Sequence, residues 1–302
     1  MFICDKIFKN DDEIRSFINN AEDHYKNQVL NIANEISKIN HIRFLTLAGP
    51  TCSGKTTTSY ILEHEFEKRG MTVKIISIDD FYRDRSDISD DHTPDYESIS
   101  AIDFPIFEDC VNKILKYETA MLPIFDFKEG TRKEFVPYTP TEHEIIIFEG
   151  IQAIYPEILS TLPKEFSKSI YISVDDDVTA YGAYFPKREI RFYRRLVRDF
   201  LFRNATVSRT LELWDGVVEN EEKNIIPNGK KADYIINSFL PYELNIIKNY
   251  LFQAVKYNDS IGKEGDLLQM IKQKFENIPE ISSHFVPQNS VFREFIGKEI
   301  YN

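Results

Sequence analysis

The sequence predicts an α/β protein with a five-stranded parallel sheet and helices on both of its faces. Five short runs of mostly β-branched and aromatic residues alternate with segments of helical periodicity, which is typical of a parallel sheet. The runs are largely apolar, as expected for strands that are buried on both faces. The predicted strands are residues 44–48, 74–78, 145–148, 170–174 and 234–236.

The bulk composition is that of a folded globular protein, with 42% hydrophobic and 28% charged residues. A net charge of −12 argues against nucleic acid as a partner, because proteins that bind it present basic surfaces. We expect no membrane partner and no signal peptide, since no apolar run approaches the roughly 18 residues of a membrane span. Cys4, Cys52 and Cys110 lie far apart and fit reduced thiols, so we expect a cytoplasmic location.

Residues 10–39 carry apolar side chains at helical spacing and predict one long helix or a kinked pair. Asn10 is placed to cap this helix, and three acidic residues fill the first turn. We favour a helix that packs on the main domain over a tether or an oligomer contact, which leaves a homo-oligomer open.

Beyond Pro241 the apolar periodicity predicts two more helices, at 242–256 and 266–276, and an irregular stretch from Pro279. We expect these last sixty residues to pack on the sheet domain. The chain is therefore divided into an N-terminal helical extension (1–40), a central domain (41–240) and a C-terminal helical extension (241–302).

The strongest motif is a phosphate-binding loop of the P-loop NTPase type, G-x-x-x-x-G-K-[ST], at residues 49–56. It lies between a predicted strand and a predicted helix at 55–69, a context that a chance match would not share. Backbone amides of such a loop bind phosphate oxygens, Lys55 reaches the β- and γ-phosphates, and the Thr56 hydroxyl binds Mg²⁺. The residues predicted to bind ATP are Gly49, Pro50, Thr51, Cys52, Ser53, Gly54, Lys55, Thr56 and Thr57.

Acidic residues follow two of the predicted strands directly. Asp79 and Asp80 come after the second strand, and Glu149 comes after the third. Ligands of open α/β sheets bind at the carboxyl ends of the strands. A carboxylate there can accept the proton of a hydroxyl nucleophile or hold the metal ion, whereas the alternative is a set of solvated turn acids. We assign Thr56 and Glu149 to the metal and Asp79 or Asp80 to the base.

Four arginines share one face of a predicted helix, because Arg191, Arg194, Arg195 and Arg198 recur at i, i+3, i+4 and i+7. Guanidinium groups hold phosphates and neutralise the charge that develops during phosphoryl transfer. The sequence therefore predicts a helical lid at about 188–215 that closes over the phosphates. A solvated face paired to acids is the main alternative, and a nucleic-acid contact ranks last.

The motifs occur in an order that resembles the uridine kinase/phosphoribulokinase family of P-loop kinases. The phosphate loop is followed by DDFY at 79–82, LPIFDF at 122–127, FEGI at 148–151 and the arginine helix. LELW at 211–214 and the terminal stretch 286–297 look like a nucleoside (uridine) kinase branch that usually follows a threonyl-tRNA synthetase-like N-terminal domain. Of that domain the sequence here shows only a likeness to its trailing helix, at residues 10–39.

The resemblance implies roles for several residues. Asp79 would be the catalytic base, and Lys55, Arg191 and Arg194 would act on the phosphates, with Arg198 as a further ATP contact. Tyr82 and Phe125 would line the acceptor pocket, which Arg191 also reaches. An acid near Asp95 would hold the ribose hydroxyls, with Asp91 and His92 as alternative registers.

One departure concerns the acceptor base. Phe125 and Gly130 stand where uridine–cytidine kinases carry a tyrosine and a histidine that read the pyrimidine, so base discrimination should be weak. We expect an ATP- and Mg²⁺-dependent kinase that phosphorylates a small-molecule hydroxyl, most simply the 5′-OH of a nucleoside. The alternatives are an ATP-binding regulatory switch and a kinase for a non-nucleoside alcohol, similar to phosphoribulokinase or pantothenate kinase.

Overall fold

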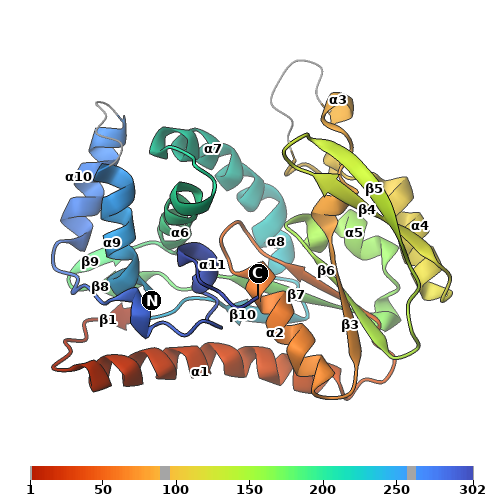
Figure 1. Ribbon diagram of the computed structural model, residues 1–302, viewed down its shortest axis with the longest axis horizontal. Helices are drawn as coiled ribbons and strands as arrows, with labels where there is room; N and C mark the ends of the chain where they lie inside the picture. Colours follow the sequence, from red (N-terminus) through yellow and green to blue (C-terminus); the bar gives the residue numbers. More distant parts are fainter. Residues whose placement is uncertain (1, 89–95, 257–262, 302) are drawn as a thin grey trace.

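A computed structural model describes residues 2–88, 96–256 and 263–301 and contains the predicted sheet (Figure 1). Its five strands are all parallel and lie in the order β10-β7-β2-β6-β3. They are β2 (Phe44–Ala48), β3 (Thr72–Ser77), β6 (Glu144–Glu149), β7 (Ser167–Ser173) and β10 (Tyr234–Asn237). The predicted fold class is confirmed, and each predicted strand matches an observed one to within three residues at either end.

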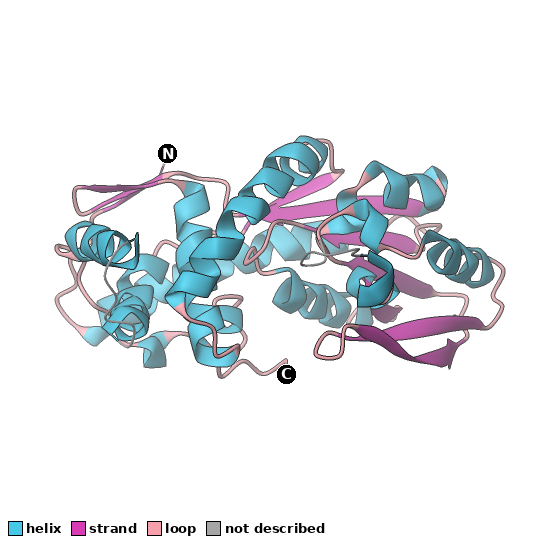
Figure 2. Ribbon diagram, turned by 90° about the horizontal axis from the view of Figure 1, so that it is seen from above, coloured by secondary structure: helices cyan, strands magenta, loops and turns pink. Residues whose placement is uncertain are grey.

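Helices cover both faces of the sheet (Figure 2). Leu45 and Leu47 of β2 face a core shared with α1 (Asp11–Ile36) and α2 (Lys55–Glu67). Phe44, on the opposite face, packs into a second core with α4 (Phe104–Leu115) and α5 (Pro156–Thr161). Both faces are buried, which explains why the strands are apolar without alternation.

The N-terminal segment forms a single helix, α1, and not a kinked pair. The side chain of Asn10 accepts a hydrogen bond from the Glu13 amide at 3.0 Å, so the predicted cap is confirmed. The buried stripe of α1 packs on α2 and β10, as the sequence predicts. Before it, β1 (Phe2–Cys4) joins β8 (Val178–Ala180) and β9 (Ala183–Phe185) in a small sheet that three-residue strands do not reveal in advance.

An antiparallel hairpin of β4 (Ala120–Asp126) and β5 (Thr131–Tyr138) lies beside the end of β3. The sequence analysis did not predict it. Its register shifts between Ile124 and Phe125, and such bulges redirect side chains near functional sites. The adjoining short elements are η1 (Ile78–Phe81), α3 (Arg85–Ile88), η2 (Ile99–Ala101), η3 (Gln152–Ile154) and η4 (Lys164–Phe166).

The arginine helix, α6 (Lys187–Phe202), is largely buried and packs against α9 (Glu243–Lys256). It is followed by α7 (Val207–Asn220), by a π-helical turn η5 (Glu221–Ile225) and by α8 (Ile226–Gly229). The residues predicted to form a lid, 188–215, therefore make up most of the buried helix α6 and the first part of α7.

The C-terminal region contains the two predicted helices, α9 and α10 (Lys263–Phe275), and then an irregular segment with η6 (Ser283–Phe285) and α11 (Arg293–Ile296). This segment returns to the sheet domain, and α11 packs against α6 near the beginning of α2 (Figure 1). Within the described ranges, no helix has the length and apolar character needed to span a membrane.

Candidate active site

The phosphate loop connects the carboxyl end of β2 to α2 through two glycines that cannot carry a side chain. A Cβ on Gly49 would lie 2.0 Å from the carbonyl oxygen of Ile172, and a Cβ on Gly54 would lie 2.4 Å from Val291 Cγ2. Gly54 also adopts φ +95°, a left-handed conformation that glycine permits. The backbone thus curls closely in front of α2, as the motif predicts.

Lys55 and Thr56 open the first turn of α2. The Lys55 ammonium donates to the Pro50 carbonyl at 3.4 Å, which bends the side chain back over the loop. The side chain of Thr56 is exposed and its hydroxyl is open to a ligand. Thr57, also predicted to bind ATP, instead donates its amide and its hydroxyl to Glu294 of α11, each at 3.2 Å.

Asp79 and Glu149 lie at the ends of neighbouring strands, because Ser77 of β3 pairs with Glu149 of β6. A Cβ on the following residue, Gly150, would lie 2.9 Å from Ile78 Cβ and 3.5 Å from Asp79 Oδ1, so glycine allows this close approach. Burial raises the pKa of Asp79 and raises that of Glu149 to about 7, while the charge of Lys55 opposes both shifts. The positive charge of Lys55 therefore stabilises the charged forms of both carboxylates.

Asp80 makes a different contact from its neighbour. Its Oδ1 accepts the amide of Phe125 on β4 at 3.1 Å, and burial raises its pKa. Asp79 Oδ1 accepts instead from the Tyr82 hydroxyl at 3.1 Å and lies within the field of Lys55. Asp79 is thus the member of the pair that the structure directs toward the phosphate loop.

Aromatic rings form a wall beside Asp79. The Phe125 ring lies 5.6 Å from that of Tyr82 and 5.9 Å from that of Tyr96, and Tyr82 and Tyr96 are 5.0 Å apart. The amide of Gln152 donates to the Tyr82 hydroxyl at 3.0 Å. The Tyr96 hydroxyl is buried and has no hydrogen-bond partner among the described residues. Sequence analysis missed Tyr96 and Gln152, because single aromatic and amide residues outside a motif carry no signal.

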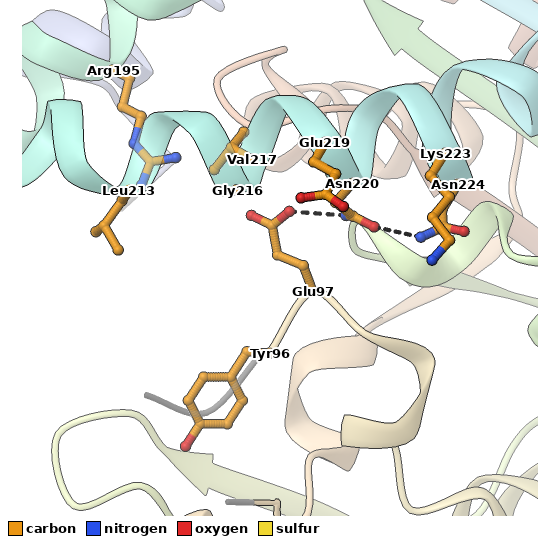
Figure 3. A pocket seen from close by; sticks show the side chains of 10 residues that line it. All are labelled: Tyr96, Glu97, Arg195, Leu213, Gly216, Val217, Glu219, Asn220, Lys223 and Asn224. Carbon is orange, nitrogen blue, oxygen red and sulfur yellow. Dashed lines mark hydrogen bonds between the residues drawn. The ribbon is translucent and has the colours of Figure 1, made fainter. Parts of the chain in front are cut away.

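A cavity of about 390 Å³ lies between this wall and α7 (Figure 3). Glu97 faces it from one side, and its Oε2 accepts from Asn220 Nδ2 at 2.9 Å. Asn220 Oδ1 in turn accepts from Asn224 at 2.7 Å and from the Tyr155 hydroxyl at 2.9 Å. Asp95, Asp91 and His92 all lie outside the described residues. Two acids line this cavity, Glu97, which lies two positions beyond the predicted Asp95, and Glu219 of α7.

Arg191 and Arg194 adjoin the phosphate loop, but neither is free on an open lid. Arg191 pairs with the buried Glu221 at 2.6 Å and donates to the Thr51 carbonyl at 3.2 Å. Arg194, with 0% exposure, pairs with Glu243 at 2.6 Å and donates to the Cys52 carbonyl at 3.2 Å. The spacing predicts arginines on a lid over the phosphates, whereas the structure buries these two side chains against acids. Both guanidinium groups hold the loop backbone from within the core.

The other two arginines of the predicted face, Arg195 and Arg198, share one acid. Arg195 and Arg198 lie 3.3 Å and 3.2 Å from Asp199, and Arg195 also lines the cavity of Figure 3. Arg198, predicted to contact ATP, is partly buried near the loop residue Cys52. The four arginines share one face of α6, as the sequence predicts, but acidic side chains neutralise most of their charge.

The donor set at the loop fits Mg²⁺. The Thr56 hydroxyl and the Glu149 carboxylate are oxygen ligands, and Mg²⁺ usually binds one or two carboxylates together with nucleotide phosphates. In the part of the chain that the structure describes, no group of three His, Cys, Asp or Glu residues could hold a metal ion without such phosphates.

Comparison with known proteins shows the family of this chain. The sequence is 31% identical over 193 residues to a uridine kinase of Clostridium novyi and to one of Listeria welshimeri, covering 63% of this chain and 84% of each relative. A solved structure from Silicibacter sp. TM1040, provisionally named a fructose transport system kinase, matches 68% of this chain and 98% of its own with 17% identity and a TM-score of 0.48. Residues 44–242 match the model of the Phosphoribulokinase / Uridine kinase family, and the chain belongs to this family.

Proposed function

We propose that the protein is an ATP-dependent nucleoside kinase that transfers the γ-phosphoryl group of ATP to the 5′-hydroxyl of a nucleoside. The observation that carries this proposal is the convergence of Lys55, Asp79 and Glu149 where β2, β3 and β6 end. A phosphate-binding cation and two carboxylates are the groups that phosphoryl transfer to a hydroxyl requires. The related proteins are named uridine kinases, and uridine is a nucleoside.

On the nucleotide side, the loop amides and Lys55 would bind the phosphates. Thr56 and Glu149 would hold Mg²⁺, which would draw the negative charge of the phosphates away from the attacking hydroxyl. Arg191 and Arg194 act as positioning residues in this proposal. They donate to the carbonyls of Thr51 and Cys52 and so fix the loop in which the phosphates would lie.

On the acceptor side, Asp79 would accept the proton of the nucleoside hydroxyl. Its raised pKa favours this role, since a base is most effective when its pKa approaches the working pH. The Tyr82 hydroxyl, which donates to Asp79 and is itself held by Gln152, would fix the carboxylate in place. Asp80 would then be a structural residue that holds η1 to the hairpin through the Phe125 amide.

The base and sugar of the nucleoside would lie between the aromatic wall and α7. Tyr82, Tyr96 and Phe125 provide ring faces for stacking, and Glu97 provides a carboxylate for the ribose hydroxyls. Arg132, a residue that could supply base contacts, pairs with Asp103 at 2.9 Å. A pocket beside the aromatic wall favours a kinase over a regulatory switch, which needs no acceptor pocket.

The three cysteines are free and buried, which suits a reducing compartment, and we place the protein in the cytoplasm.

The proposal is tested by measuring ADP release in a coupled assay across nucleosides, sugar phosphates and pantothenate-like alcohols. We expect release that requires both Mg²⁺ and a nucleoside. Release without any acceptor would indicate an ATPase or switch, and release with another alcohol alone would move the chain to a different branch of its family.

A further inference from the structure

The C-terminal segment, residues 286–301, is wedged between the beginning of α2 and the arginine helix. Val291 occupies the space in front of Gly54, and the guanidinium of Arg194 lies 4.8 Å from the centre of the Phe295 ring. Arg293 is buried and donates to the carbonyls of Ser283 and Val286 at 2.7 and 2.6 Å. These contacts anchor the segment firmly against the phosphate loop.

The anchored segment carries an acid to the first turn of α2. Glu294 Oε2 accepts from both the amide and the hydroxyl of Thr57 at 3.2 Å, and Glu299 Oε2 accepts from the same hydroxyl at 3.4 Å. The Thr57 amide is among the first N–H groups of the helix, which have no acceptor within the helix. Such amides, at the positive end of the helix, are the donors that bind anions.

A carboxylate and a nucleotide phosphate would therefore meet at the same donors. Both are anionic acceptors, so they repel each other and cannot share one amide. The C-terminal segment thus places the negative charge of Glu294 at the site where the phosphates of the nucleotide would bind.

We propose that Glu294 is a built-in competitor of the nucleotide phosphates, so that the C-terminal segment restrains nucleotide binding. The proposal rests on the assigned phosphate site. Because Arg293 and Phe295 are buried on either side, rotation of the flexible Glu294 side chain is enough to release Thr57 while the segment stays in place. A nucleotide gains Thr57 only after displacing this carboxylate.

The test is calorimetric titration of Mg·ADP into wild-type protein and the Glu294→Gln variant. Glutamine keeps the size of the side chain but loses its charge, so we expect the variant to bind ADP more tightly by on the order of tenfold, the factor that one charge-assisted hydrogen bond contributes. Glu299→Gln should give a smaller gain. Glu280→Gln, at an exposed position of the same region, is the matched control and should bind as wild type does.

Equal or weaker ADP binding by Glu294→Gln would overturn the inference and make Glu294 a structural or nucleotide-holding residue. Urea unfolding of each variant separates this result from a loss of folded protein. If wild type, Glu294→Gln and Glu280→Gln all fail to bind ADP while remaining folded, the phosphate-site assignment itself is wrong. The two failures are therefore distinguishable.

Discussion

Asp79 and Asp80 are adjacent in the sequence but make different contacts, which gives a direct test of the base. Asp79→Asn should lower turnover by about 10²–10⁴-fold with nucleotide binding retained, because the amide cannot accept the proton. Asp80→Asn is the matched control. Its side-chain oxygen can still accept the Phe125 amide, so most activity should remain. Initial rates and ADP titrations of both variants measure this, and the reverse pattern would assign the base to Asp80.

Base preference depends on the aromatic wall. Phe125 cannot hydrogen-bond through its side chain, so we expect kcat/KM for uridine and cytidine to exceed that for adenosine and guanosine by less than about a hundredfold. The Tyr96 hydroxyl, which has no hydrogen-bond partner among the described residues, is a group that can read a base edge. Tyr96→Phe should reduce whatever discrimination exists without changing ADP affinity. A larger uridine preference that survives this substitution would contradict the prediction.

Sequence reasoning identified residues that belong to a spaced motif and missed residues that act through tertiary contact. Lys55 and Asp79 follow from the loop pattern and the strand end, and the structure places them in each other's field. Glu97 and Tyr96 lie outside every motif, and Glu294 lies in a terminal stretch whose resemblance gives no contact. Glu294 reaches Thr57 across 237 positions of the chain, a contact that no spacing rule can indicate.

The arginines of α6 have the predicted spacing, but several of them are buried in the core. Arg194→Ala would leave Glu243 buried without its cation, which costs about 3–5 kcal/mol of unfolding free energy. Arg195→Ala should cost far less, because Asp199 keeps Arg198 as a partner. Urea unfolding of both variants measures the difference. Equal, small losses would mean that Arg194 is not held in the core.

Element prediction succeeded where a strand or helix carries a long apolar pattern and failed where it does not. The five core strands and the buried stripe of α1 could be predicted from their apolar residues, and β2 is buried throughout. β5 is mostly exposed, and its pairing with β4 depends on contacts that periodicity does not encode. The apolar side of α6 indicates a packed helix, but the burial of its arginine face was missed because arginine spacing does not reveal the acids that pair with it.

Stability of the entire chain should depend on pH through Glu149. Its pKa rises from 4.5 to about 7 on folding, so the folded state keeps a proton that the unfolded chain has lost. The free energy of unfolding should therefore fall as pH rises from 4.5 to 7. Glu149→Gln should remove this loss and exceed wild-type stability by about 2–3 kcal/mol above pH 7.

The exposed Glu142→Gln, in the loop before the same strand, is the matched control and should follow the wild-type curve. Chemical unfolding of the three proteins between pH 4.5 and 8 provides the measurement. Identical pH profiles for wild type and Glu149→Gln would show that burial does not raise the pKa of Glu149.

The nucleoside kinase assignment is tested most directly by analysing the product of one reaction. Wild-type protein is incubated with Mg·ATP and a nucleoside, and the product is identified by mass spectrometry and phosphorus NMR. We predict a nucleoside 5′-monophosphate, formed in equal amount with ADP and absent with Lys55→Ala. ADP that accumulates while the nucleoside stays unmodified, or a phosphate found at another hydroxyl, would contradict the assignment.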